Sequence, residues 1–265
     1  MPSNLGTALV TGASSGIGAT YADRLAGRGY DLVIVARDAA RLTELAGKLS
    51  ATHGVKVDIL AVDLGQSAGV SAVEQRLRQD DSITLFVNNA GIGPTGSLLE
   101  SDLDYLDKMV ALNVTAANRL AVTAAQVFAA KGKGAIVNTA SVVALAPQLF
   151  NGTYVATKAF VLGLTEALAS ELVGKGVKLQ AVLPGLTRTE IFDRVGRSFD
   201  DFDKERVMDV GDMVDAALSG FDQGELVTIP SLGDKGLYDS YIAARGELGP
   251  HLSRREPAAR YGVKS

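Results

Sequence analysis

The segment 11–18, Thr-Gly-Ala-Ser-Ser-Gly-Ile-Gly, constrains the fold of this chain more than any other stretch. It follows the short apolar run 8–10, Ala-Leu-Val, and precedes a helical pattern that begins near Ile17. We therefore expect a strand, a tight turn and a helix N-terminus in succession. The turn and the close approach of the helix use residues that lack a Cβ, namely Gly12, Gly16 and Gly18. Backbone N–H groups at such a helix start favour an anionic ligand.

The spacing of these glycines leaves two interpretations open. The common dinucleotide fingerprint is G-x-G-x-x-G, whereas this segment has G-x-x-x-G-x-G. One interpretation is a pyrophosphate-binding turn. The other is a turn whose glycines serve only the packing of the helix against the strand. The rest of the chain has to decide between them.

Apolar runs alternate with helical patterns along most of the sequence. Two of the intervening segments, 16–28 and 39–50, are long enough for crossover helices. The expected strands are Thr7–Val10, Asp31–Ala36, Val55–Val62, Ile83–Val87, Ala135–Thr139, Val177–Val182 and Leu226–Ile229. Several are nearly continuous in aliphatic residues, which is typical of parallel strands covered on both faces. We predict an α/β fold: a Rossmann-type, doubly wound parallel sheet of about seven strands with helices on both faces, in a single domain spanning 1–265.

Composition narrows the classes of function. The formal net charge of -4 in 265 residues gives no reason to expect a nucleic acid or an anionic membrane as partner. Cysteine is absent, which excludes disulfides and thiolate catalysis. The only histidines, His53 and His251, lie far apart in the sequence, so no metal site is expected. Without a leader or a long apolar run, the chain is expected to be soluble and cytoplasmic.

The end of the second expected strand bears on the choice of cofactor. Enzymes that prefer NAD usually carry an acidic residue about 20 positions after the glycines, whereas a basic residue suits a 2′-phosphate. Here the strand ends in Ala36 and is followed by Arg37, which favours NADP. Asp38 is a competing acidic candidate one residue later, and a solvated surface arginine is the alternative interpretation of Arg37.

Polar residues also follow the third and fourth expected strands. Asp63 stands after the third and 88–91, Asn-Asn-Ala-Gly, after the fourth. Ligands bind outside the carboxyl ends of such strands, although each residue alone is equally typical of a cap or a turn. The cofactor contacts expected in this half of the chain are Gly12, Ser14, Ser15, Gly16, Ile17, Gly18, Arg37, Asp63, Leu64, Asn89, Ala90 and Gly91.

A set of motifs, in order, resembles the short-chain dehydrogenase/reductase family. They are Thr11-Gly12-x-x-x-Gly16-Ile17-Gly18, Asn88-Asn89-Ala90-Gly91, Asn113, Ser141, Tyr154-x-x-x-Lys158 and Pro184-Gly185. The resemblance spans roughly 5–230 and implies hydride transfer between a carbonyl and an alcohol, with NADP(H) preferred and NAD(H) possible. It also implies a homodimer or homotetramer packed through the helices that hold Asn113 and Tyr154.

Four residues are the expected catalytic group. Tyr154 and Lys158 lie four apart in a helical pattern over 152–172, so they share one face. An ammonium beside the phenol would favour the phenolate and lower the pKa of Tyr154 from its ordinary value near 10. Ser141 can hydrogen-bond the reacting oxygen, and the resemblance implies that Asn113 holds a relay water. Each residue taken alone has another possible role. Tyr154 could be an interface aromatic, Lys158 a solvated helix charge, Ser141 a turn residue and Asn113 a buried amide whose hydrogen bonds are satisfied.

The resemblance assigns the later segments as well. It implies that Pro184, Gly185 and Thr187 contact the cofactor, with Lys158 also bonding its ribose beside Tyr154, and that a substrate lid covers about 188–210. A run of apolar residues after Ser141 would line the pocket and favour a mainly apolar substrate: Val142, Val143, Leu145, Leu149 and Phe150. The alternative is that these residues belong to the hydrophobic core.

The chain departs from many family members after Pro230. Its C-terminal extension, 231–265, replaces the Gly-rich ending of the 3-oxoacyl-carrier-protein reductases, which argues against that role. Leu237, Tyr238, Tyr241 and Ile242 have helical spacing, so we expect an ordered tail that closes the pocket or joins a subunit contact.

The sequence therefore predicts an NADP(H)-dependent oxidoreductase that acts on a small-molecule carbonyl or alcohol, with Tyr154 as general acid or base. A catalytically silent dinucleotide-binding sensor or scaffold is the alternative. A sugar-nucleotide epimerase or dehydratase is disfavoured by the glycine spacing and the short C-terminal region.

Overall fold

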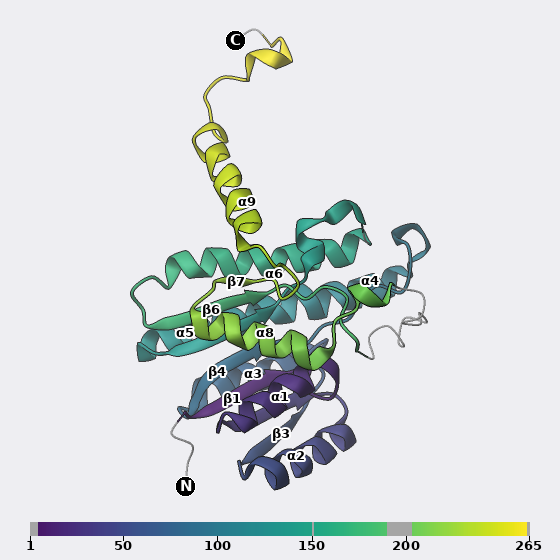
Figure 1. Ribbon diagram of the computed structural model, residues 1–265, viewed down its shortest axis with the longest axis vertical. Helices are drawn as coiled ribbons and strands as arrows, with labels where there is room; N and C mark the ends of the chain where they lie inside the picture. The colour runs from purple at the N-terminus through teal and green to yellow at the C-terminus, as the bar shows by residue number, and fades with distance from the viewer. Residues whose placement is uncertain (1–4, 150, 190–202, 264–265) are drawn as a thin grey trace. The chain divides into compact units, whose positions relative to one another are not determined.

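A computed structural model describes residues 5–149, 151–189 and 203–263. Its centre is a parallel seven-stranded sheet in the order β3-β2-β1-β4-β5-β6-β7 (Figure 1). The strands are β1 (Thr7–Thr11), β2 (Asp31–Ala36), β3 (Val57–Ala61), β4 (Ile83–Asn88), β5 (Gly134–Thr139), β6 (Val177–Val182) and β7 (Val227–Thr228). Every pair in this order is parallel, so their carboxyl ends share one edge of the sheet.

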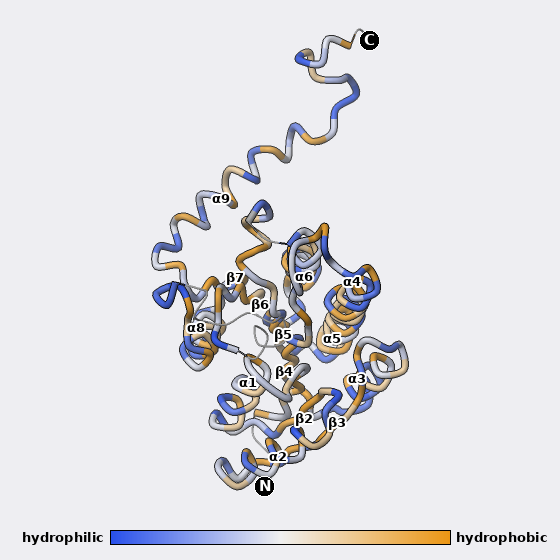
Figure 2. Tube along the Cα trace, turned by 90° about the vertical axis from the view of Figure 1, so that its right-hand side faces the viewer, coloured by the Kyte–Doolittle hydropathy of each residue, from blue (hydrophilic) through white to orange (hydrophobic). Residues whose placement is uncertain are grey.

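Helices cover both faces of the sheet, which appears edge-on in Figure 2. One face packs against α1 (Gly16–Gly27), α2 (Ala39–His53) and α8 (Val210–Gln223). The other packs against α3 (Ser67–Gln79), α5 (Ala117–Lys131) and α6 (Gly152–Glu171). Side chains of β2 alternate between the two cores, with Leu32 and Ile34 in the first and Val33 and Val35 in the second. The aliphatic strands are therefore buried on both faces, and the predicted doubly wound fold is confirmed.

The structure adjusts several predicted boundaries. The edge strands β3 and β7 are shorter than the runs 55–62 and 226–229, because an edge strand has a partner on one side only. The single helix expected over 103–130 is α4 (Leu103–Val110), a π-helical turn at Ala111–Ala116, and α5. In the parts of the chain that the structure describes, no helix has the length and apolarity that a membrane crossing requires.

The chain divides into two compact units, 1–231 and 232–265. The first contains the sheet and its covering helices. The second contains α9 (Lys235–Leu248) and two short 3-10 turns, at Gly249–His251 and Ala259–Tyr261. The division falls where the sequence departs from the family pattern. Of the predicted lid, residues 190–202 lie outside the described part of the chain, as does Phe150.

The turn between β1 and α1 tolerates only glycine at two of its positions. Gly12 has a φ of 68°, and a Cβ there would lie 2.9 Å from the Ala90 Cα. A Cβ on Gly18 would lie 2.2 Å from the carbonyl oxygen of Gly12. The start of α1 thus lies directly against the turn, as the sequence predicted, and the backbone of the turn lies against the segment that follows β4.

The crowding at Gly18 predicts opposite effects for one substitution at two helical glycines. Gly18→Ala should lower the free energy of unfolding by about 2 kcal/mol or more, because backbone atoms must move. Gly47→Ala, in α2 with no atom near its added Cβ, should raise it by about 0.5–1 kcal/mol. Urea unfolding measures both. Equal effects at the two positions would contradict the close approach at Gly18.

Candidate active site

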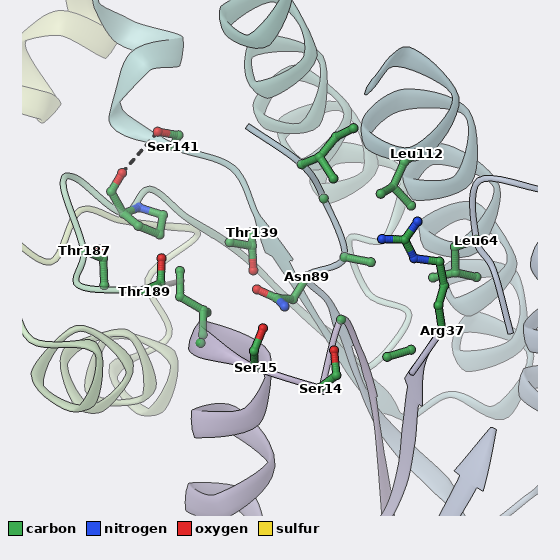
Figure 3. A pocket seen from close by; sticks show the side chains of 18 of the residues that line it. Ser14, Ser15, Arg37, Leu64, Asn89, Leu112, Thr139, Ser141, Thr187 and Thr189 are labelled. Atoms are coloured by element: carbon green, nitrogen blue, oxygen red, sulfur yellow. Dashed lines mark hydrogen bonds between the residues drawn. The ribbon is translucent and has the colours of Figure 1, made fainter. Parts of the chain in front are cut away.

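A pocket of about 480 Å³ opens at the carboxyl ends of the strands. Figure 3 shows Ser14, Ser15 and Arg37 on one side of it and Ser141 and Thr187 on the other. The expected site residues that line it are Gly12, Ser14, Ser15, Gly16, Ile17, Arg37, Asp63, Leu64, Asn89, Ala90, Gly91, Ser141, Tyr154, Lys158, Pro184, Gly185 and Thr187. Gly18 and Asn113 do not line the pocket; both are buried behind residues that do.

The side chain of Thr11 fixes one wall of the pocket. Its Oγ1, fully buried, donates to the Val87 carbonyl at 3.2 Å and accepts from the backbone N–H groups of Asn89 and Ala90 at 2.9 and 3.1 Å. The Asn89 Nδ2 donates back to the Thr11 carbonyl at 3.0 Å. These bonds hold the segment after β4 against the glycine turn, so the two walls form one unit.

The start of α1 has the chemistry of an anion site. Ser15 occupies its N-cap without a side-chain capping bond, and the first turn of the helix holds no acidic residue. The first backbone N–H groups of a helix lack intrahelical partners and carry partial positive charge. Because Ser14, Ser15 and Gly16 line the pocket, an anionic ligand there would meet these donors.

The structure shows how the competing acidic residue Asp38 is used. It is the N-cap of α2, and its Oδ1 accepts from the Arg41 backbone N–H at 3.0 Å. Its Oδ2 lies 3.6 Å from the Arg41 Nε. Both carboxylate oxygens thus face the first turn of α2. After β2 the pocket lining therefore carries two guanidinium groups, Arg37 and Arg41, and the carboxylate of Asp38, which Arg41 partly neutralises; Asp63 adds a second carboxylate after β3.

The π-helical turn explains an asparagine inside a long helix. A wider turn of this kind inserts one residue into a helix and is frequent at functional sites. Asn113 is buried there, accepts from the Ile92 N–H and donates to the Ile92 carbonyl, both at 2.9 Å. Its Nδ2 also lies 3.3 Å from the Thr157 Oγ1 on α6. Asn113 thereby joins the wall after β4 to the helix that holds Tyr154 and Lys158.

Tyr154 and Lys158 lie together on α6, as their spacing predicts. The Lys158 Nζ is 5.8 Å from the Tyr154 ring centroid and donates to the Thr139 carbonyl at the end of β5, at 2.9 Å. Ser141 begins the next turn, and its Oγ donates to the Pro184 carbonyl at 3.2 Å (dashed in Figure 3). Phenol, amine and hydroxyl therefore converge on one end of the pocket.

The expected direction of the tyrosine shift is wrong for these side chains. Burial raises the pKa of Tyr154 to about 12, and a hydrogen bond with Ser141 opposes this rise only in part. Burial also lowers the pKa of Lys158 to about 8. The physical reason is desolvation: the same dry surroundings that disfavour the phenolate disfavour the ammonium that was expected to stabilise it.

Sequence analysis missed part of the site and misplaced another part. Thr139, Arg41 and Thr189 line the pocket, and only Arg41 had a visible signal, four residues after Arg37. Of the apolar residues named after Ser141, the three whose side chains the structure describes, Val142, Val143 and Leu145, do not line it. Val142 and Leu145 pack on the core cluster of Val161 and Leu162, and Val143 is buried, so the alternative interpretation applies to them.

A buried polar chain across the sheet was also missed. The Asn88 Nδ2 donates to the Asn138 Oδ1 at 3.1 Å, and the Asn138 Nδ2 donates to the Thr165 Oγ1 on α6 at 3.0 Å. Asn138 is fully buried in β5. A lone amide within an apolar strand was the available signal, because buried amides need partners. The chain aligns α6 with the ends of β4 and β5.

Comparisons with known proteins show clear likeness. A model of the short chain dehydrogenase family matches residues 6–198. A solved short-chain dehydrogenase from Sphingobium yanoikuyae in complex with NADPH is 46% identical and superposes with a TM-score of 0.93, covering 98% of this chain and 100% of that one. The bulky-bulky ketone specific alcohol dehydrogenase from Comamonas testosteroni is 46% identical, with a TM-score of 0.90 over 97% of this chain and 99% of its own.

A curated relative is more distant. The very-long-chain 3-oxoacyl-CoA reductase-A of Danio rerio is 32% identical over 188 residues, which is 69% of this chain. This chain spans 59% of that relative's length.

The buried amine of Lys158 predicts a pH-dependent gain in stability on its removal. Burial holds its pKa near 8 rather than 10.5, so the unfolded chain binds a proton more tightly between these values. The cost to stability is full below about pH 8 and disappears as the pH rises toward 10.5. Lys158→Met should raise the free energy of unfolding by about 1–3 kcal/mol at pH 7, less the lost bond to Thr139.

Urea unfolding of Lys158→Met from pH 7 to 10.5 measures this, with the exposed Lys175→Met as control. A gain that does not shrink with rising pH, or a control that behaves alike, would contradict the assignment.

Proposed function

The chain belongs to the short-chain dehydrogenase family of NAD(P)-dependent oxidoreductases, and we propose that it is an NADP(H)-dependent enzyme that interconverts a carbonyl and an alcohol with Tyr154 as the proton-transferring group. The observation that carries the proposal is one pocket with two chemical ends. An anion-binding helix start lies at one end, and a phenol, a hydroxyl and a buried amine lie at the other.

Tyr154 and Ser141 act on the reacting oxygen in this proposal. When bound, the cofactor supplies or accepts the hydride at the substrate carbon. Because the pKa of Tyr154 is about 12, its phenol keeps its proton through the neutral range. It can therefore donate that proton to the oxygen as the carbonyl is reduced. The Ser141 hydroxyl, which donates to the Pro184 carbonyl in this structure, would turn to the substrate oxygen and donate a second hydrogen bond there. The protonated phenol is the form that reduction of a carbonyl requires.

Lys158 and Asn113 supply the proton route and its alignment. The Lys158 Nζ lies beside the Tyr154 ring and is held by the Thr139 carbonyl. With a pKa near 8, it exchanges protons at neutral pH more readily than an exposed lysine. Asn113 binds both the N–H and the carbonyl of Ile92, which fixes its amide beside this route. The same Lys158 amine is proposed to bond the ribose of the cofactor.

NADP(H) fits the pocket better than NAD(H). The start of α1 offers donors for the pyrophosphate, and Arg37 stands at the end of β2 where a 2′-phosphate would lie. Asp38 would repel that phosphate if it were unpaired, but its oxygens face the first turn of α2 and Arg41. The NADPH complex of the Sphingobium yanoikuyae protein supports this choice.

An apolar carbonyl compound is the proposed substrate class. The Comamonas testosteroni neighbour is named for bulky ketones, and it matches nearly the whole chain. Within the described residues, the apolar part of the lining includes Ile92, Leu112 and Ala140, none of which carries charge. No basic side chain other than Lys158 lines this end of the described pocket, as a phosphosugar would require.

A cytoplasmic homodimer or homotetramer packed through α5 and α6 completes the proposal. Ala156, Gly163 and Ala167 are exposed along α6 at helical spacing, and Phe160 lies on the same side with 38% of its surface exposed. Small residues allow a second helix to approach closely.

Tyr154→Phe tests the assigned chemistry. The variant keeps the ring but cannot transfer a proton, so kcat for ketone reduction should fall by about a thousandfold or more. The Kd for NADPH, measured by fluorescence titration, should change by less than about threefold. Retention of near wild-type kcat would contradict the role of Tyr154.

Arg37→Ala tests the cofactor preference. Loss of a charge-assisted hydrogen bond, about 1.5–3 kcal/mol, should weaken NADPH binding by about ten- to hundredfold and leave NADH binding nearly unchanged. Arg28→Ala is a matched control, because Arg28 pairs with Asp222 away from the pocket. An equal loss of affinity for NADPH and NADH would contradict the role of Arg37 and would favour Asp38 as a ligand of the ribose.

A further inference from the structure

Gly91, the last residue of the segment 88–91 after β4, is not required by its backbone conformation to be a glycine. Gly12 and Gly16 have φ angles of 68° and 53°, in the left-handed region that favours glycine, whereas Gly91 lies outside that region. The nearest atoms that a Cβ on Gly91 would meet, apart from its chain neighbours, belong to side chains and not to the backbone. The reason for a glycine here therefore lies in the side chains around it.

Two groups of the proposed proton route face the side of Gly91 that lacks a side chain. A Cβ on Gly91 would lie 3.1 Å from the Asn113 Oδ1 and 3.7 Å from the Lys158 Nζ. Gly91 itself is exposed and lines the pocket, whereas Asn113 and Lys158 are buried. The space in front of the Gly91 Cα is therefore within reach of both buried groups.

Both groups can make a further hydrogen bond there. The Asn113 Oδ1 accepts one bond, from the Ile92 N–H at 2.9 Å, and a carbonyl oxygen has two lone pairs. The Lys158 Nζ donates one bond, to the Thr139 carbonyl at 2.9 Å, and an ammonium has three hydrogens. A water in front of Gly91 can donate to the Asn113 Oδ1 and accept from the Lys158 Nζ, which gives it the two polar partners that a bound water needs at least.

Close approach of a bound cofactor is the alternative reason for a glycine in a pocket wall. In that case the side of the residue that lacks a Cβ would face the open pocket. At Gly91 this side faces Asn113 and Lys158 instead. The direction of the missing side chain therefore favours a role in the proton route.

We propose that Gly91 is a positioning residue for proton transfer, because its missing side chain leaves room for a water that links Asn113, Lys158 and the pocket. The inference rests on the proposed function, since it concerns the proton that Tyr154 gives to the substrate oxygen. For each carbonyl that is reduced, Tyr154 gives up one proton, Lys158 returns one to the phenolate, and the water passes one from the solvent to Lys158. The water is neither consumed nor formed.

The surroundings of Lys158 explain why its amine needs such a water. Burial lowers the pKa of Lys158 to about 8. The described groups around the amine are the Tyr154 phenol, the Thr139 carbonyl and the Asn113 amide. Among these only Tyr154 also titrates, and its pKa of about 12 makes it a poor source of protons for the amine. Water is therefore the route by which Lys158 exchanges protons with the solvent at neutral pH.

Gly91→Ala tests the inference with the smallest possible side chain. The added methyl group would displace the water, and only the end of a side chain has to give by a few tenths of an ångström, so the variant should fold. With NADPH and an apolar ketone at neutral pH, kcat should fall by about three- to tenfold. Deuterium oxide should slow the variant by a larger factor than the wild type, because return of the proton becomes rate-limiting. The Kd for NADPH should change by less than about threefold.

Gly152→Ala is the matched control. A Cβ on Gly152 would lie 3.2 Å from the Leu98 Cδ2, nearly as tight as the contact at Gly91, and Gly152 stands two residues before Tyr154 on α6. This variant should keep kcat and the solvent isotope effect near their wild-type values. An equal loss in both variants would mean that crowding near Tyr154 lowers the activity, and it would overturn the role of Gly91.

The pH dependence of stability gives a readout that needs neither cofactor nor substrate. A methyl group in place of the water removes a hydrogen-bond partner from the Lys158 ammonium. The urea midpoint of Gly91→Ala should therefore fall further below the wild-type midpoint at pH 7 than at pH 10.5, where the amine of the folded chain is neutral. Gly152→Ala should shift the midpoint equally at both pH values. An equal shift for Gly91→Ala would overturn its link to Lys158.

The outcomes separate this inference from the proposed function. Ketone reduction by the wild type, with kcat and isotope effect unchanged in Gly91→Ala, would overturn the role of Gly91 and leave the proposed function intact. A rise of more than about tenfold in the Kd for NADPH with an unchanged solvent isotope effect would identify a cofactor contact and overturn the inference as well. Failure of the wild type to reduce any ketone would overturn both.

Discussion

The hydrogen bonds of the Thr11 hydroxyl are the interactions on which the pocket depends. The hydroxyl joins β1 to the segment after β4 with one donated and two accepted hydrogen bonds, all in a fully buried position. β1 and β4 are neighbours in the sheet although their first residues, Thr7 and Ile83, lie 76 positions apart in the sequence. The parallel order brings their carboxyl ends to one edge, and the hydroxyl fixes the distance between the walls.

Desolvation shapes the other end of the pocket. Burial shifts both groups toward their neutral forms: the phenol of Tyr154 keeps its proton, and the pKa of Lys158 falls to about 8. Keeping these groups out of water lowers the stability of the fold. Hydrogen bonds in the surrounding elements offset this cost. The chain of amides through Asn88 and Asn138 and the pinned amide of Asn113 hold α6 in place around them.

The sequence was sufficient for the fold and for most of the pocket lining. Glycine spacing and aliphatic runs specify backbone geometry, so the turn at Gly12 and Gly18 followed directly. Burial of individual side chains could not be read in the same way. The pKa of Tyr154 depends on water exclusion by residues distant in sequence, and the orientation of Asp38 depends on the capping of α2. Val142 and Leu145 looked like pocket residues because local sequence does not reveal which face a short turn presents.

The most direct measurement of the central claim follows the hydride itself. The enzyme would be incubated at neutral pH with NADPH that carries deuterium at C4 of the nicotinamide and with a panel of apolar ketones, aldehydes and phosphorylated sugars. The account predicts one deuterium on the carbinol carbon of an apolar ketone product, with no such transfer to a phosphorylated sugar. Tight NADPH binding without deuterium transfer to any carbonyl would contradict it and would identify a silent dinucleotide-binding protein.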